Sequence, residues 1–163
     1  MTFFLRFART TSVPSLAVGQ RVVVEGKVVA ESRIKVPGTD FDAVYHETLT
    51  EEFKAGVRQG RAFWQVASQD EELEPFWVED SGGRVYVRPE PGRVLVRGGR
   101  SDRGPGKRNG TRYVARWIAA GDVVRVRGTV AQPKPGKKGK VRPGLEILGA
   151  EADRLVILFR RPS

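Results

Sequence analysis

The chain has 163 residues, no cysteine, 39% hydrophobic residues and a formal net charge of +10 at pH 7. This length fits one domain with its own core, and the lack of cysteine excludes disulfides, thiolate metal sites, iron–sulfur clusters and cysteine nucleophiles. Arg6 and Arg9 interrupt the apolar start well before the roughly 18 residues that a membrane span needs. We therefore expect a cytoplasmic protein, or the soluble part of a membrane-associated one.

The net charge is concentrated in two segments that are rich in glycine and proline. Residues 97–112 and residues 133–144 each carry a net charge of +5, and the rest of the chain carries 18 basic and 18 acidic side chains. Charge confined to short segments raises the electrostatic potential locally, so we expect an anionic polymer or an as yet unidentified protein as partner. The basic residues of the two segments are Arg97, Arg100, Arg103, Lys107, Arg108 and Arg112, and Lys134, Lys137, Lys138, Lys140 and Arg142.

The remaining composition hints at a thermophilic source. Asn109 is the sole asparagine, and arginine outnumbers lysine by 21 to 8. Depletion of thermolabile residues is typical of thermophiles, although a GC-rich genome gives a similar arginine bias. Valine dominates the apolar residues and favours strands over helices.

Residues 1–17 are expected to form an N-terminal arm that leads into a repeated strand pattern. The pattern G-x-x-V-x-V-x-G-x-V occurs at residues 19–28 and again at residues 121–130. Valine alternates with polar residues at the strand period, and the central glycine is typical of a bent or bulged strand. The repeat therefore predicts two similar strands of one small barrel.

An acidic excursion from the barrel is predicted over residues 31–75. Residues 40–80 contain 11 acidic and 3 basic side chains. One strand is expected around residues 44–53 and a returning strand through residues 63–66, while residues 71–74 give the only helical signal, a single turn. The acidic excursion and the basic loops are expected to attract each other, either within one molecule or between copies that self-associate.

The strongest hairpin signal lies at residues 76–87, where two short runs of strand-forming residues flank Asp80-Ser-Gly-Gly83. Many short strands, frequent turn signals and almost no helix predict an all-β, OB-like barrel with an inserted β-hairpin and two long basic loops. Further strands are expected at residues 42–53, 61–68, 93–97, 112–118, 145–148 and 154–160.

The order of these motifs resembles the GIDE-type domain, which is known from a mitochondrial outer-membrane E3 ubiquitin ligase and from uncharacterised prokaryotic proteins. The resemblance implies an OB-like fold and an interaction role. It does not imply ubiquitin chemistry, because the chain has no cysteine for a RING domain, and it implies a membrane only if the natural protein has flanking spans. The matching pieces are Arg9-Thr-Thr, the strand at 19–26, Pro37-Gly38, Val44-Tyr45-x-Glu47, Trp64, the hairpin at 75–87 and the strand at 118–128.

The first basic segment superficially suggests a phosphate-binding loop. A Walker motif ending at Gly106-Lys107 requires glycine at position 101 and serine or threonine at position 108, where the chain has Ser101 and Arg108. No helix is expected to follow it. Residues 97–112 and 133–144 are then either loops that grip the backbone of single-stranded nucleic acid or solvated linkers.

The hairpin at residues 76–87 provides a candidate aromatic patch. With a two-residue or four-residue turn, Phe76 and Val78 share one face while Trp77 and Tyr86 share the other. If the Phe76 side lines the barrel, the outer pair can stack on bases or sugars. Alternatively, the hairpin at residues 42–67 or the N-terminal arm covers the pair as a second small core.

No cofactor, metal site or catalytic site is predicted. His46 is the only histidine and has Asp40, Asp42 and Glu47 nearby in sequence, but His46 and Glu47 face opposite ways on a strand. The carboxylates of residues 70–74 are typical of a solvated loop, and no nucleophile elbow supports a Ser–His–Asp triad. The sequence favours a non-enzymatic binding module, and its alternative is single-stranded nucleic-acid binding through the two basic segments.

Overall fold

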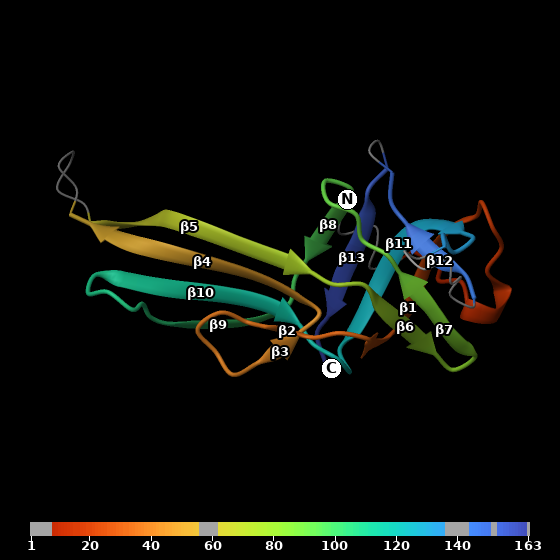
Figure 1. The fold of residues 1–163 in the computed structure, drawn as a ribbon, viewed down its shortest axis with the longest axis horizontal. Helices are drawn as coiled ribbons and strands as arrows, with labels where there is room; N and C mark the ends of the chain where they lie inside the picture. Colours follow the sequence, from red (N-terminus) through yellow and green to blue (C-terminus); the bar gives the residue numbers. More distant parts are fainter. Residues whose placement is uncertain (1–7, 56–61, 136–143, 151–152, 163) are drawn as a thin grey trace.

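The computed structural model describes residues 8–55, 62–135, 144–150 and 153–162, and these residues form almost only strands. The strands make a barrel and a long arm that projects from it (Figure 1). One short 3-10 helix, η1 (Val13–Ser15), precedes the barrel. In the part of the chain that is described, no helix is long and apolar enough to span a membrane. The all-β prediction is confirmed.

Five strands close the barrel: β1 (Arg21–Ala30), β6 (Phe76–Asp80), β7 (Gly83–Val87), β12 (Glu146–Leu148) and β11 (Val123–Ala131). Each pairs with the next in that order, and the pairing of β11 with β1 completes the ring. All five pairings are antiparallel except that of β7 with β12. β13 (Leu155–Arg160) and β8 (Val94–Arg97) extend the sheet beyond β11. The predicted OB-like barrel is confirmed.

The two copies of the repeated pattern lie in β1 and β11, and they pair with each other. Each strand changes partner near its central glycine: β1 passes from β11 to β6 near Gly26, and β11 passes from β13 to β12 near Gly128. A Cβ at Gly26 would collide with the backbone carbonyl of Glu79, and one at Gly128 would collide with Ile147. These glycines are required because a third strand approaches the backbone closely.

Alternating valines fill the barrel. Val22, Val24 and Val28 of β1 are at most 3% exposed, and the inward faces of the other barrel strands contribute similar residues. Removing one such side chain from water is worth about 1.5 kcal/mol or more. The alternation in the sequence therefore sets which face of each strand points inward.

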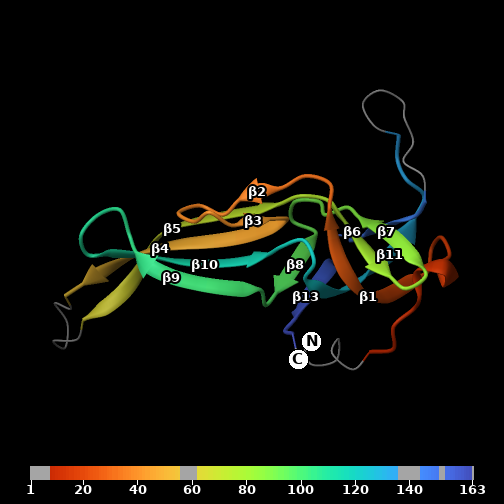
Figure 2. The ribbon, with the colours of Figure 1, turned by 90° about the horizontal axis from the view of Figure 1, so that it is seen from below.

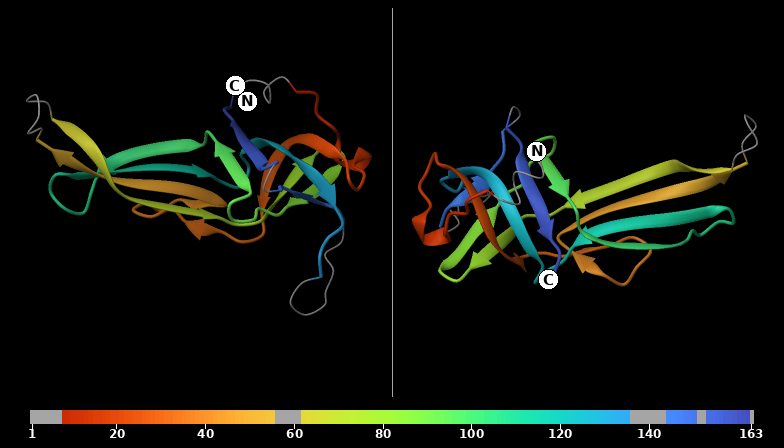
Figure 3. Two further views of the ribbon diagram at one scale, coloured as in Figure 1. Left: turned by 90° about the horizontal axis from the view of Figure 1, so that it is seen from above. Right: turned by 180° about the vertical axis from the view of Figure 1, so that it is seen from behind.

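The arm is a four-stranded antiparallel sheet in the order β5 (Phe63–Leu73), β4 (Tyr45–Lys54), β10 (Thr111–Ile118) and β9 (Arg100–Pro105). A small hairpin of β2 (Ile34–Lys35) and β3 (Asp42–Ala43) lies along one face of the arm near the barrel (Figure 3). It buries Val36 and Ala43 against Trp117, and Phe41 stacks on Trp117 at 4.8 Å between ring centroids. The face next to the barrel thus has a small core of its own.

An ion pair fixes the arm to the barrel. Arg100, the first residue of β9, donates to both carboxylate oxygens of Asp122 at 2.6–3.0 Å. Asp122 is 5% exposed and also accepts the backbone N–H of Ala119. A buried carboxylate needs such partners, so Arg100 has a structural role.

Two predictions are corrected, and one hairpin was not predicted. Residues 100–105 form a strand and not a basic loop, because β10 supplies hydrogen-bond partners that override the weak strand propensity of this segment. Residues 71–74 do not form a helical turn, because β5 continues to Leu73 in pairing with β4. The strands β2 and β3 have two residues each: β3 lies within the strand expected at residues 42–53, whereas β2 and its pairing with β3 were not predicted.

Candidate functional site

The cations of the first basic segment are divided between two roles. Three of them form ion pairs: Arg100 with Asp122, Arg108 with Glu52, and Arg112 with Glu51. The other three, Arg97, Arg103 and Lys107, make no ion pair with any residue in the described ranges. About half of this positive charge is therefore already compensated within the molecule.

The compensation follows from strand pairing. β10 carries the arginines and β4 carries the glutamates, and the register places Arg112 opposite Glu51 and Arg116 opposite Glu47. Both pairs form across the strands, and the Arg112 guanidinium also lies over the Trp64 ring at 4.2 Å. The acidic excursion and the first basic segment thus attract each other within one molecule.

The described start of the second basic segment, residues 133–135, lies at the end of the molecule opposite to the turn between β9 and β10. Of its cations, Lys134 is exposed, whereas Lys137, Lys138, Lys140 and Arg142 lie outside the described residues. Figure 2 shows the chain that leaves β11 at one end and the turn between β9 and β10 at the other. The described parts of the two basic segments do not converge.

The aromatic pair is on the outer side of the β6–β7 hairpin. Asp80 pairs with Gly83 across a two-residue turn, so Phe76 and Val78 are buried in the barrel and Trp77 lies opposite Tyr86 on the other face. The parity argument for the hairpin is therefore confirmed. The use of the pair as a stacking surface remains a prediction.

The surroundings of the aromatic pair limit what it can stack on. The rings of Trp77 and Tyr86 lie 5.0 Å apart, and the Arg84 guanidinium lies 4.5 Å from the Trp77 ring centroid. Tyr86 is 5% exposed and donates a hydrogen bond to Glu31 at 3.1 Å. Trp77, which is half-buried, is therefore the more accessible ring of the two.

The second basic segment ends beside this pair. The backbone N–H of Tyr86 donates to the carbonyl oxygen of Leu145, which immediately precedes β12. Residues 133–144 therefore lead directly into the strand that flanks the aromatic hairpin. The first basic segment makes no such connection.

His46 is buried within the arm. It is 1% exposed, and its ring nitrogens lie 3.5 Å from the Thr48 hydroxyl and 3.5 Å from a carboxylate oxygen of Glu72. Among the described residues, no group of three or more His, Asp or Glu side chains is placed to hold a metal ion. The polar neighbours of His46 are therefore residues of the arm sheet itself.

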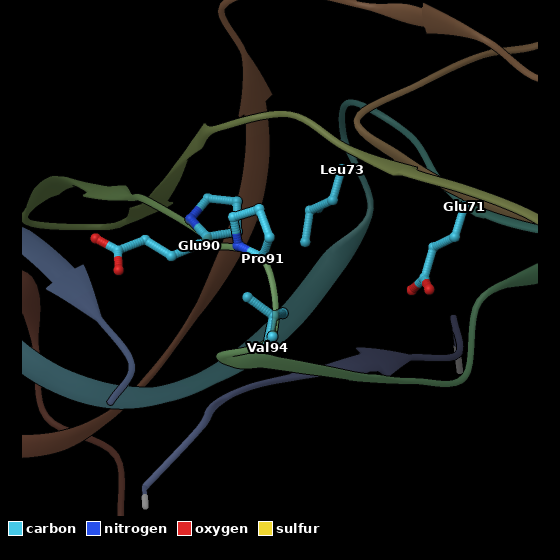
Figure 4. Close-up of a pocket in the computed structure, with 7 residues that line it drawn as sticks. Glu71, Leu73, Glu90, Pro91 and Val94 are labelled. Atoms are coloured by element: carbon cyan, nitrogen blue, oxygen red, sulfur yellow. The ribbon is translucent and has the colours of Figure 1, made fainter. Parts of the chain in front are cut away.

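The acidic residues of β5 do not form a catalytic pair. Glu72 shares a face of the sheet with His46, whereas Glu71 shares the opposite face with Glu47. Glu71 and Glu90 line a cleft of about 300 Å³ and lie at its two ends, separated by apolar side chains (Figure 4). Retaining and inverting glycosidases instead need two carboxyl groups that face each other across the scissile bond.

A basic cleft that sequence reasoning missed lies where the barrel meets the arm. The cleft has a volume of about 580 Å³ and is lined by Arg97, Arg160 and Arg161. Arg160 is the last residue of β13, and Arg161 comes directly after it. The Arg160 guanidinium forms an ion pair with Glu25 at 3.8 Å. The parallel pairing of β8 with β13 brings these arginines together from distant parts of the chain.

The arm also carries an exposed edge strand that was not recognised as a binding surface. All residues of β5 from Phe63 to Glu72 are exposed, and β5 has only β4 as a partner. Apolar side chains gather at the far end of the β4–β5 hairpin, where Phe53, Phe63, Trp64 and Val66 are 37–51% exposed. The sequence signal for this surface was the mostly apolar run Phe63-Trp-Gln-Val66. The edge position of the strand is visible only in the structure.

These features define an all-β protein with an OB-like barrel, a projecting arm and no resolved catalytic constellation among the described residues. Comparisons with protein-family models, with curated proteins and with solved structures find no match.

Proposed function

We propose that this chain is a non-enzymatic binding module whose arm docks a protein partner by strand addition to β5. The observation that carries the proposal is the open edge of β5, which is 11 residues long. Exposed edges of this length present unpaired backbone groups that recruit another strand. Recognition by strand addition obtains affinity from these groups and specificity from the flanking side chains.

The side chains along β5 indicate the chemistry of the partner segment. The half of β5 near the tip of the arm offers Phe63, Trp64 and Val66, whereas the half near the barrel offers Asp70, Glu71 and Glu72. A complementary segment is extended, apolar at one end and basic at the other. The resemblance to the GIDE-type domain supports an interaction role, and only the order of the sequence motifs supports that resemblance.

Selection of displayed random 12-residue peptides on the immobilised protein tests this function. Enriched peptides are expected to combine apolar and basic residues, and to bind the Val66→Lys variant at least tenfold more weakly, because a lysine blunts the edge. Val18→Lys is the matched control, since Val18 and Val66 are 54% and 51% exposed. Peptides that lose affinity equally for both variants, or no enrichment at all, would contradict the proposal.

A second candidate function is binding of single-stranded nucleic acid on the outer face of the β6–β7 hairpin. One observation favours it: the basic residues 133–144 directly precede Leu145 and β12, and Leu145 pairs with Tyr86, which lies beside Trp77. OB barrels bind oligonucleotides on the face of their second and third strands and with the loop between the fourth and fifth, which here are β6, β7 and residues 132–145. Fluorescence anisotropy with labelled oligonucleotides at several salt concentrations tests it.

A further inference from the structure

A third cavity lies on the face of the arm that the β2–β3 hairpin partly covers. Its volume is about 470 Å³, and it is lined by the β2–β3 turn at Pro37 and Gly38, by β4, and by the turn between β9 and β10. Figure 2 shows that the hairpin ends before it reaches that turn. The cavity occupies the space between them.

The floor of the cavity is built from hydroxyl groups. Thr50 and Tyr113 lie opposite each other on β4 and β10, and Thr48 and Thr111 line the same cavity. Nearer to the barrel, this face of β10 carries Ala115 and Trp117, which pack under the hairpin. The sheet face therefore changes from apolar to polar where the hairpin ends, and the polar part lines the cavity.

Two of these hydroxyl groups remain available as donors. Tyr113 donates to Asp102 at 3.0 Å, and Thr111 donates to the carbonyl oxygen of Arg108. Thr50 makes no side-chain hydrogen bond with the described residues, and the hydroxyl of Thr48, which is 7% exposed, has only the His46 ring nitrogen at 3.5 Å as a hydrogen-bond partner within the same ranges. The donors of Thr48 and Thr50 face the cavity without a strong partner.

The rim of the cavity is cationic and held in place. Lys107 and Arg108 line it, and backbone hydrogen bonds from Gly106 to Thr111 at 2.9 Å and from Phe53 to Gly110 at 2.8 Å anchor their turn. Arg108 pairs with Glu52 at 3.0 Å, whereas Lys107 makes no ion pair with any described residue. The rim thus retains about one positive charge for a ligand.

Two glycines allow the wall residues of the cavity to pack closely against the backbone. A Cβ at Gly104 would collide with the Tyr113 ring, and one at Gly106 would collide with Thr111. A side chain at either position would push a wall residue out of place. The glycine-rich stretch that fails as a Walker motif therefore shapes a different cavity.

We infer that this cavity binds the phosphate group of a small phosphate ester. The ammonium group of Lys107 and the two hydroxyl donors are groups that recognise phosphate oxygens, and the volume suits a small ligand. Lys107 neutralises the phosphate, Thr48 and Thr50 donate to its oxygens, and the Tyr113 ring forms the wall for the attached group.

Nuclear magnetic resonance titration of the full chain with glycerol 3-phosphate, glycerol and inorganic phosphate tests the inference. Glycerol 3-phosphate is expected to shift the amide signals of Gly38 and of residues 48–50 and 106–111 in a saturable way, and glycerol is not. Lys107→Ala is expected to weaken binding about tenfold or more, because a charge-assisted hydrogen bond is lost. Thr50→Val, which keeps the side-chain shape, is expected to weaken it about threefold to tenfold.

The matched control is Arg103→Ala. It removes one positive charge from the same hairpin, but Arg103 pairs with Val114 on the other face of the sheet. Unchanged binding by this variant supports the inference. The inference would be overturned if Arg103→Ala and Lys107→Ala weakened binding equally, if no saturable shifts appeared, or if the shifts were confined to other residues. It would also be overturned if a single-stranded oligonucleotide bound these residues more tightly than the ester.

Discussion

At the scale of single residues, two glycines in equivalent positions of the repeated pattern determine how the barrel closes. Gly26 and Gly128 each allow a neighbouring strand to approach the backbone more closely than any Cβ permits. The repeat predicted bent strands, because glycine inside a strand pattern is a local signal. It did not predict which strand approaches, because that depends on residues about 50 positions away in β6.

Gly26→Ala is predicted to destabilise the protein by about 3 kcal/mol, since the new methyl group must displace the backbone of β6. Gly92→Ala is the control: the space around Gly92 is open, and only its φ of +76° penalises alanine, at about 1 kcal/mol. Urea unfolding followed by tryptophan fluorescence measures both. A Gly26→Ala cost no larger than that of Gly92→Ala would show that β6 yields without strain.

The tyrosines of the arm predict how stability responds to alkaline pH. Burial raises the pKa of Tyr45 well above its ordinary value, although the Arg116 guanidinium opposes part of that rise. The hydrogen bond to Asp102 raises the pKa of Tyr113 in the same direction. Both phenols keep their protons in the folded state at a pH where the unfolded chain releases them.

Folding stability is therefore predicted to hold below about pH 10 and to fall as the pH rises further, since ionisation then favours the unfolded chain. Tyr45→Phe should make the fall above pH 10 shallower, because it removes one such phenol. Urea midpoints between pH 8 and 11 measure the difference. Identical slopes for the two proteins would mean that Tyr45 ionises within the folded state.

At the scale of elements, the pairing of β4 with β10 joins an acidic strand to a basic one. The charge patterns of both segments were visible in the sequence, but the register that places Arg112 opposite Glu51 was not. β9 escaped prediction for a related reason. Its glycine, proline and charged residues have low strand propensity, and its conformation depends on β10.

Arg112→Glu is predicted to destabilise the protein by about 1 kcal/mol, because it opposes two carboxylates across the strands and removes the guanidinium from Trp64. The double variant Glu51→Arg/Arg112→Glu should recover about half of that loss, through the reversed ion pair. A double-mutant cycle by urea unfolding measures the coupling. If the stability loss of the double variant equals the sum of the losses of the two single variants, the ion pair between Glu51 and Arg112 contributes nothing, and Arg112 acts only through packing on Trp64.

At the scale of the whole molecule, the fold class followed from composition and turn signals, whereas the distribution of charge in space did not. A chain with two basic segments of equal charge suggests one large basic surface. The turn between β9 and β10 and the described start of the second segment instead lie at opposite ends, and half of the cations in the first segment are paired. Only long-range topology separates them.

This separation predicts the salt dependence of any nucleic-acid binding. Five cations that contact phosphates on a single strand give a slope of about −3.5 in log affinity against log salt, whereas eleven converging cations would give about twice that. Replacing Lys134, Lys137, Lys138, Lys140 and Arg142 by glutamine should abolish most of the slope. Replacing the unpaired Arg97, Arg103 and Lys107 should leave it nearly unchanged, because Arg103 and Lys107 lie on the arm and Arg97 lies in β8, which is separated from β12 by β11 and β13. Anisotropy titrations between 20 and 200 mM salt, roughly the range over which counterion release is measurable, separate the outcomes. Equal losses of affinity in both variants would mean that the net charge of the protein binds the nucleic-acid strand, and not the face of the β6–β7 hairpin.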